Sequence, residues 1–312
     1  MHLPNDLSEA NRKIMKTSAL FRPSRILCPV DFSDLSRLAL KYAAAGARAF
    51  GSTLVVFHAQ RFELPAYFTG GQVAELTRQH RAELKRAREF LRLHLRKVLG
   101  GQAMDLPIKF EVVDAHPVDA VLGAAKRHRA DLIVMGTRGR GGSKRLWLGS
   151  VAESVMRQAG VPVFVARQKQ HEFIDSADAR AMPKLATILC PVNFSEAARA
   201  GLEHAASLAQ QFGARLVTAC VVERGDARGV PEVRKQLALW LGEDGPAECE
   251  VQVVARRGQS AASEIVSLAS EVRADLVVLG AQPRKLLQTW LWGDTTEFVL
   301  RNAPAPVLVV PR

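Results

Sequence analysis

The sequence predicts an α/β protein made of two tandem doubly wound domains, each built on a five-stranded parallel sheet. Short apolar runs of strand length alternate with amphipathic segments of helix length throughout the chain. Nearly the whole pattern occurs twice, and a repeat of this size indicates two domains rather than a solenoid. At 312 residues the chain is also long enough for two cores of ordinary size.

The elements of the first copy follow from its periodicity. Gly51 ends the first helix and Pro117 lies near the first turn of a later one, and both positions suit these residues. The expected strands are residues 26–30, 53–59, 108–113, 131–135 and 162–166. The expected helices are residues 34–50, a long charged helix before residue 108, residues 117–129 and a helix from Ser150. Strands that alternate with helices predict a right-handed parallel sheet covered on both faces.

The repeat also sets the expected domain boundaries. The segment RILCPVDFS from Arg25 returns as TILCPVNFS from Thr187, and RADLIVMG from Arg129 returns as RADLVVLG from Arg273. The offset falls from 162 to 144 residues, so the first copy carries 18 extra residues between its second and third strands. We expect a basic N-terminal extension (1–24), a first domain (25–167), a polar linker (168–184) and a second domain (185–312).

Composition narrows the class of protein. A hydrophobic content of 48% with 24% charged residues is typical of a globular chain. No apolar run reaches the roughly 18 residues that a membrane helix needs, and the N-terminal segment lacks the apolar core of a secretory signal. The four cysteines show no metal-ligand spacing. We therefore expect a reduced cytoplasmic protein with no membrane partner and no metal site.

The formal net charge of +12 favours an anionic partner. A nucleotide, a nucleic acid or a membrane surface would each fit this charge. Only 6% of the residues are aromatic and no nucleic-acid-binding motif is present, which makes nucleic acid the weaker interpretation. The basic segment 78–97 is expected to be a solvated helix face, with nucleic-acid contact as the alternative.

The segment GTRGRGGSKRLWLGS, residues 136–150, follows the fourth expected strand and contains five glycines, three arginines and a lysine. Glycines let backbone N–H groups approach phosphate oxygens, and a helix N-terminus adds positive partial charge. The spacing Gly136-x2-Gly139-x9-Gly149-Ser150 is neither a P-loop nor the dinucleotide fingerprint, which belongs after a first strand. In doubly wound sheets ligands bind at the carboxyl ends of strands, near the switch in strand order, and this segment is expected there.

This glycine spacing after DLIVMG resembles the nucleotide loop of the universal stress protein family, and PVDFS at the end of strand one is similar to that family's entry motif. The resemblance covers nearly the whole chain as a tandem of two domains. It implies a Rossmann-like fold of the adenine nucleotide alpha hydrolase type and a role in stress response or signalling. It also implies bound ATP, with Mg²⁺ as a candidate companion, and pairing through the fifth strand within the chain or in a homodimer.

The resemblance assigns ligand contacts residue by residue. Asp31 matches the carboxylate that meets the adenosine. The residues matched to the adenosine side are Pro29, Val30, Asp31, Ala59, Met135 and Gly136, and those matched to the phosphates are Arg138, Gly139, Gly149, Ser150 and Val151. Two of these residues also have a purely structural interpretation. Asp31 could be a helix N-cap, and Ser150 with Glu153 has the pattern of a capping box.

The second copy is an internal control for these assignments. Pro283 stands where the first copy has Gly139, Asp294 stands for Ser150, and Asn193 stands for Asp31. Proline removes an N–H donor and fixes the backbone. We expect Asp294 to cap its helix, but its carboxylate would repel a phosphate at the same helix end. The first domain is therefore expected to bind ATP, and the second to carry a degenerate site.

Two other functions stay open at this stage. The chain could be a weak ATPase, or an interaction scaffold that binds no nucleotide and recruits an acidic partner through its basic surface. Hydrolysis needs an oriented water and metal ligands, and the sequence shows no adenylyl-transfer motif and no carboxylate pair beside the loop. We therefore assign no catalytic residue and expect slow hydrolysis at most.

Overall fold

The computed structural model describes residues 20–61, 70–100, 106–137, 148–167, 173–174, 182–241, 249–281, 284–286, 289–291 and 293–312. The chain divides into two compact units. The amino-terminal domain comprises Pro23–Gln168 and Ile174–Met182, and the carboxy-terminal domain comprises Met1–Arg22, Lys169–Phe173 and Pro183–Arg312. Within the described ranges no helix combines the length and the apolar character that a membrane span requires.

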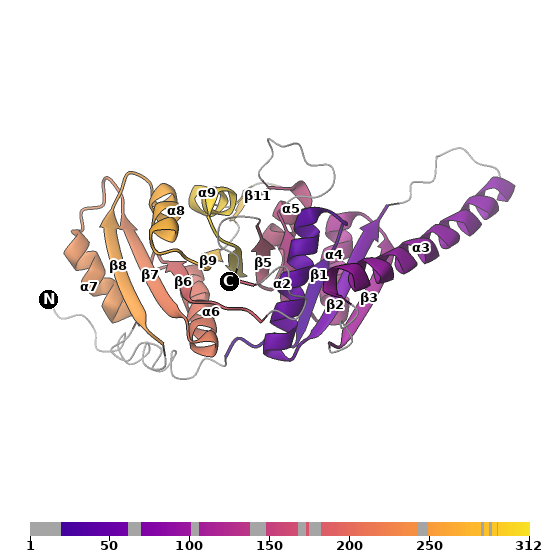
Figure 1. Cartoon of the computed structure of the whole chain (residues 1–312). Helices are drawn as coiled ribbons and strands as arrows, with labels where there is room; N and C mark the ends of the chain where they lie inside the picture. Colours follow the sequence, from indigo (N-terminus) through magenta and orange to yellow (C-terminus); the bar gives the residue numbers. More distant parts are fainter. Residues whose placement is uncertain are drawn as a thin grey trace. The chain divides into compact units, whose positions relative to one another are not determined.

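A parallel sheet forms the centre of the amino-terminal domain, as the sequence predicts (Figure 1). Its strands lie in the order β3-β2-β1-β4-β5, and each described neighbour pair is parallel. The strands are β1 (Arg25–Pro29), β2 (Thr53–Gln60), β3 (Ile108–Asp114), β4 (Leu132–Gly136) and β5 (Val163–Ala166). Strand order reverses between β1 and β4, so the switch point of this sheet lies between their carboxyl ends.

Helices cover both faces of this sheet. The helices are α2 (Asp34–Phe50), α3 (Gly70–Leu99), α4 (Pro117–His128) and α5 (Ser150–Gln158). α2 and α3 pack together on one face, and α4 and α5 pack together on the other. Gly51 ends α2 in the left-handed conformation and Pro117 occupies the first turn of α4, which confirms both sequence predictions.

The carboxy-terminal domain repeats the same architecture. Its parallel strands lie in the order β12-β9-β6-β7-β8. These strands are β6 (Thr187–Pro191), β7 (Arg215–Val222), β8 (Val251–Arg257), β9 (Leu276–Ala281) and β12 (Val307–Pro311). The helices are α6 (Glu196–Phe212), α7 (Val230–Leu241), α8 (Ala261–Glu271) and α9 (Asp294–Asn302). An antiparallel hairpin of β10 (Arg284–Leu286) and β11 (Thr289–Leu291), which the sequence did not predict, lies between β9 and α9.

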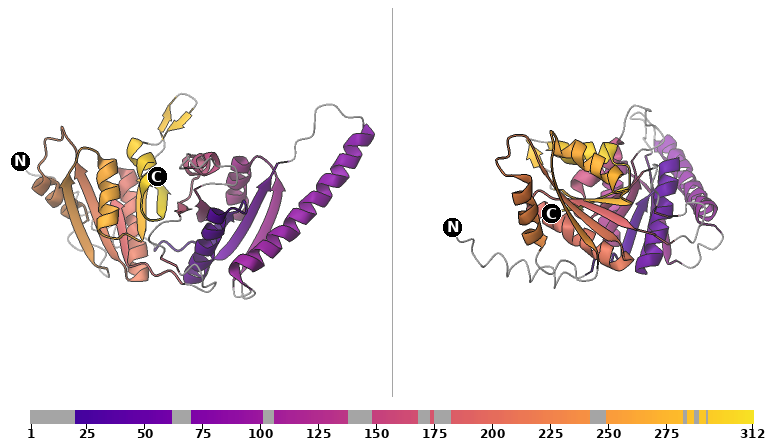
Figure 2. Two further views of the ribbon diagram at one scale, coloured as in Figure 1. Left: turned by 45° about the horizontal axis from the view of Figure 1, so that its top comes forward. Right: turned by 60° about the vertical axis from the view of Figure 1, so that its left-hand side comes forward.

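One helix accounts for the length difference between the copies. α3 has 30 residues, whereas α7, its counterpart before the third strand, has 12. The 18 extra residues of the first copy therefore lengthen a helix. Figure 2 shows α3 running beside the sheet and past the end of the strands that it covers.

The cores consist of strand residues and the inner faces of the helices. Cys28, Cys190 and Cys220 lie buried within strands, as expected for small apolar side chains, and all four cysteines are free. Of the expected N-terminal extension, residues 1–19 lie outside the described residues. Most of the expected linker also lies outside them, but Phe173 and Ile174 within it are buried.

Candidate functional site

The carboxyl ends of β1 and β4 lie side by side at the switch point of the amino-terminal sheet. β1 pairs with β4 through Ile26 opposite Leu132 and Leu27 opposite Ile133. Both chain segments that the sequence singles out, the turn at Asp31 and the residues from Gly136, leave the sheet at this edge. The fold therefore brings the two segments to neighbouring positions, where ligands bind in doubly wound sheets.

Asp31 is held by the turn that follows β1. Its Oδ1 accepts hydrogen bonds from the backbone N–H of Ser33 at 3.0 Å and from the Ser33 hydroxyl at 2.6 Å. Ser33 is the N-cap of α2 and accepts from the N–H of Ser36 at 3.2 Å. The interpretation of Asp31 as the N-cap is therefore wrong. Asp31 instead fixes the residue that caps the helix, and its half-buried carboxylate keeps a set position.

The carboxy-terminal domain builds the same turn with an amide. Asn193 Oδ1 accepts from the N–H of Ser195 at 3.2 Å, and Ser195 caps α6. The intervening phenylalanine has a left-handed backbone in both copies, with φ of 65° at Phe32 and 61° at Phe194. The turn therefore needs a side-chain oxygen at this position. The negative charge of Asp31 exceeds what the fold requires.

The residues matched to the base pocket differ in how exposed they are and in whether their backbone polar groups already have partners. Val30 and Met135 are buried, whereas Pro29 and Ala59 are half-buried. The Val30 N–H donates to Phe57 O at 2.7 Å, and His58 Nδ1 lies 2.8 Å from Val30 O. Both backbone polar groups of Val30 are thus engaged. His58 also packs against the Phe32 ring, with centroids 4.6 Å apart, as expected for a histidine with a structural role.

Gly136 has a packing role that its counterpart shares. A Cβ atom on Gly136 would lie 3.0 Å from the Leu35 carbonyl oxygen of α2. On Gly280, at the same point of β9, it would lie 1.6 Å from Ala197 O of α6. Both glycines therefore let a helix approach the end of a strand closely. The retention of Gly280 in the second copy follows from the fold and carries no information about a ligand.

The two ends of the glycine-rich segment meet in one backbone hydrogen bond. Gly149 N–H donates to Thr137 O at 2.6 Å, and Thr137 and Leu148 are both buried. Arg138 and Gly139, two of the matched phosphate positions, lie outside the described residues. The sequence does not single out Thr137, because its role as the anchor of the loop depends on the return of the chain at Gly149.

The N-terminus of α5 differs from the expected capping box. Gly149 is the N-cap and makes no side-chain cap bond, and Ser150 is the exposed first residue of the helix. The capping-box interpretation of Ser150 is therefore wrong. The first helical bond joins Glu153 N–H to Gly149 O at 2.9 Å, so the N–H groups of residues 150–152 have no partner within the helix. N–H groups without helical partners, the hydroxyl of the exposed Ser150 and a helix N-terminus can together hold an anionic group.

The same position in the carboxy-terminal domain carries a carboxylate instead of a hydroxyl. Gly293 is the N-cap of α9 without a side-chain cap bond, so the expectation that Asp294 caps this helix is wrong. Asp294 is the exposed first residue and is the carboxylate that the first copy lacks, since Glu297 has its counterpart in Glu153 of α5. Carboxylates there stabilise the helix electrostatically and would repel a phosphate. Pro283 lies outside the described residues.

Among the residues that the structure describes, no group of three or more His, Cys, Asp or Glu side chains could hold a metal ion.

The chain matches the universal stress protein family twice, over residues 23–167 and 185–311. These two matches span most of the sequence and follow the repeat. The chain belongs to the universal stress protein family.

Individual members of the family resemble either one copy or the whole chain. A universal stress protein of Thermus aquaticus is 36% identical over 142 residues, covering 46% of this chain and 97% of its own length. One from Mycolicibacterium smegmatis is 24% identical and covers 91% of this chain and 96% of its own. The crystal structure of a universal stress protein from Archaeoglobus fulgidus has a TM-score of 0.64 at 22% identity, covering 94% of this chain and 100% of its own, and shows the same fold.

Proposed function

We propose that the amino-terminal domain binds ATP and that the chain acts as a nucleotide-dependent module in stress response or signalling. The carboxy-terminal domain then has a structural or pairing role. One observation carries this proposal. At matching positions of the same fold, the first copy has Asp31 and Ser150 where the second has Asn193 and Asp294, and neither difference is needed to form the turn or the helix.

The residues present suit a phosphate-bearing ligand. Ser150 is exposed at the first position of α5, beside N–H groups without intrahelical partners. Asp31 is held at the adjacent strand end, where its carboxylate could accept hydrogen bonds from a hydroxyl or an amine. Bound ATP would be the signal to which this module responds. The protein residues would bind the ligand and orient it, and no described residue is assigned to its hydrolysis.

Calorimetric titration with ATP and Mg²⁺ tests the proposal on the intact chain. We expect one site per chain, and its loss in Gly139→Pro, which copies the second domain's residue into the first. Release of phosphate during the titration would indicate a weak ATPase. Two sites per chain would show that the carboxy-terminal domain also binds, and absence of binding to the wild-type chain would favour the scaffold function.

A second substitution, Asp31→Asn, tests the site without disturbing the fold. Asp31→Asn should keep the turn, because Asn193 makes the same bond to its serine. Losing a hydrogen bond to a charged group costs about 1.5–3 kcal/mol, so ATP affinity should fall about ten-fold or more. Asn193→Asp is the matched control and should leave both affinity and stoichiometry unchanged. Equal affinity of Asp31→Asn and wild type would remove Asp31 from the proposed site.

A further inference from the structure

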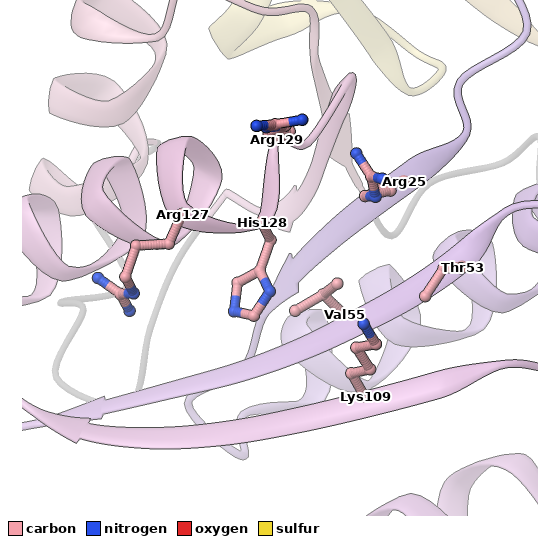
Figure 3. A pocket seen from close by; sticks show the side chains of 7 residues that line it. All are labelled: Arg25, Thr53, Val55, Lys109, Arg127, His128 and Arg129. Carbon is pink, nitrogen blue, oxygen red and sulfur yellow. The ribbon is translucent and has the colours of Figure 1, made fainter.

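A second candidate site lies at the opposite edge of the amino-terminal sheet, where β1, β2 and β3 begin. A hollow of about 320 Å³ opens there beside the C-terminal end of α4. This volume is at the lower end of the range for small-molecule sites. Arg25, Lys109, Arg127 and Arg129 bring four permanent positive charges to its walls, with Thr53, Val55 and His128 between them (Figure 3).

The strand register explains why cations from distant parts of the sequence meet here. Arg25 of β1 pairs with Thr53 of β2, and Lys109 of β3 pairs with Val55. Side chains at paired positions of parallel strands, and at alternate positions along one strand, share a face of the sheet. This is the face that α4 covers. Arg129 follows α4 in a left-handed conformation, with φ of 48°, as the chain turns toward β4.

Two carboxylates lie near the hollow, and both are already engaged. Glu111 accepts from Arg127 at 2.9 Å and pairs with His128 at 2.7 Å. Burial raises the pKa of Glu111, but the hydrogen bonds from His128 and Arg127 outweigh it, so its pKa lies below the ordinary value. Asp131 accepts the backbone N–H groups of Ser24 at 2.8 Å and Arg25 at 2.9 Å.

Three cations therefore remain available to a ligand. Arg25, Lys109 and Arg129 are exposed, and their side chains form no ion pair within the described part of the chain. An arginine guanidinium binds phosphate oxygens with two parallel hydrogen bonds. Several unpaired cations around one small hollow favour a compact ligand with several negative charges.

The carboxy-terminal domain shows that the fold does not require this cluster. Thr187 stands at the position of Arg25, since it pairs with Arg215 as Arg25 pairs with Thr53. Gln252, opposite Val217, stands at the position of Lys109, opposite Val55.

The C-terminal end of α8 in that domain also has fewer positive charges than the end of α4. Glu271 replaces Arg127 and pairs with Arg256 at 3.0 Å. Arg215, at the position of Thr53, directs its guanidinium to the Thr187 hydroxyl at 3.4 Å. The second copy keeps an arginine at the position of Arg129, namely Arg273 with φ of 51°, so the combination that is specific to the first copy is Arg25, Lys109 and Arg127.

We propose that this hollow binds a small polyphosphate anion, meaning a ligand with two or more linked phosphate groups, at a site separate from the glycine-rich loop. Arg25, Lys109 and Arg129 contact the phosphate oxygens, and Glu111 positions Arg127 and His128 beside them. Single-stranded nucleic acid is a poorer occupant, because such sites use aromatic side chains on which bases stack. The hollow is lined by no phenylalanine, tyrosine or tryptophan among the described residues.

Calorimetric titration with sodium tripolyphosphate tests the proposal. Since tripolyphosphate would also suit the glycine-rich loop, the titration uses the full chain carrying Gly139→Pro. We expect one tripolyphosphate per chain, bound more weakly as the salt concentration rises. Adding Arg25→Gln and Lys109→Gln should reduce the affinity about ten-fold or more, because two charged hydrogen-bond donors are lost.

The matched control is Lys85→Gln with Arg86→Gln, which removes the same charges from exposed positions on α3. It should change the affinity less than about two-fold, because neither residue lines the hollow and salt screens exposed charges that do not contact the ligand. Unchanged thermal midpoints would show that both double variants fold. Absence of tripolyphosphate binding, or equal losses in the two double variants, would overturn the proposal. It would also be overturned if only a single-stranded oligonucleotide bound and Arg25→Gln with Lys109→Gln abolished that binding.

Discussion

The glycine at the end of the strand before the loop determines how closely a helix packs on each sheet. In the carboxy-terminal domain a Cβ on Gly280 would lie 1.6 Å from Ala197 O, which no side-chain rotation can relieve because the obstacle is backbone. In the amino-terminal domain the corresponding distance from Gly136 to Leu35 O is 3.0 Å. The two positions are equivalent in the fold, but they tolerate a methyl group to different degrees.

We therefore expect Gly280→Ala to destabilise its domain more than Gly136→Ala does. Overpacking of a well-packed site costs about 1–3 kcal/mol, which we expect for Gly136→Ala, and Gly280→Ala should exceed this range. Gly160 is the control, because a Cβ there meets nothing within 4 Å, and Gly160→Ala should be neutral or stabilise by about 0.4–1 kcal/mol. Chemical denaturation followed by tryptophan fluorescence measures all three. Equal costs for Gly280→Ala and Gly160→Ala would contradict the packing argument.

At the scale of elements, a short segment packs on a helix of the carboxy-terminal domain. The Phe21 N–H donates to the Ser207 hydroxyl at 2.6 Å, and the Phe21 ring lies 4.6 Å from the ring of His204, both on α6. Burial lowers the pKa of His204 below 6.5, although a hydrogen bond to the Ala200 carbonyl and the charge of Glu203 act in the opposite direction. The unfolded chain therefore takes up this proton first as the pH falls. The contribution of His204 to stability is complete above pH 6.5 and is lost as the pH falls through the folded-state pKa.

Phe21→Ala should raise the pKa of His204 toward its ordinary value, because the substitution removes part of the cover that keeps the ring from water. The loss of stability on acidification below about pH 6.5 should become smaller to the same extent. NMR titration of the His204 ring measures the pKa directly. Leu20→Ala removes a neighbouring exposed side chain and should leave this pKa unchanged. An unchanged pKa in Phe21→Ala would show that Phe21 does not desolvate the histidine.

The sequence predicts elements well where one periodicity dominates. The alternation of apolar runs and amphipathic segments places the strands and helices of the first copy within a few residues. The repeat places the extra residues between the second and third strands, and the structure shows that they lengthen α3. Helix starts are predicted less well. Ser150 and Asp294 outrank glycine in N-cap preference, yet Gly149 and Gly293 cap their helices. Gly149 is also the residue whose N–H donates to Thr137 O, and this backbone bond closes the loop at the end of the strand.

Two features could not be predicted because they depend on pairing between segments. The strands β10 and β11 contain three residues each, too few to show an alternating pattern, and they form through their mutual register. The hollow at the amino ends of the strands gathers cations from three separate segments. Their order along the chain does not show that Arg25 and Lys109 lie on either side of β2. The sheet topology brings them together.

At the scale of the whole molecule, two copies of one fold place a negative charge at different positions of the same edge. The amino-terminal domain has Asp31 beside a helix whose first turn begins with Ser150, whereas the carboxy-terminal domain has Asn193 beside a helix that begins with Asp294. A ligand that binds only one domain should stabilise that domain alone, by RT ln(1 + [L]/Kd). The asymmetry can therefore be measured in the intact chain.

Hydrogen exchange with mass spectrometry should detect this asymmetry. At an ATP concentration about 100 times the Kd the stabilisation is about 2.7 kcal/mol, so amides that exchange through opening of the binding domain should slow about 100-fold. We expect this slowing in peptides covering residues 29–36 and 149–156. Peptides covering 191–198 and 293–300, at the same places in the second copy, should exchange as in the absence of ATP. Gly139→Pro should remove the effect from the first pair. Equal protection of both pairs would mean that the second copy binds as well, and that a carboxylate at the start of α9 does not exclude a nucleotide.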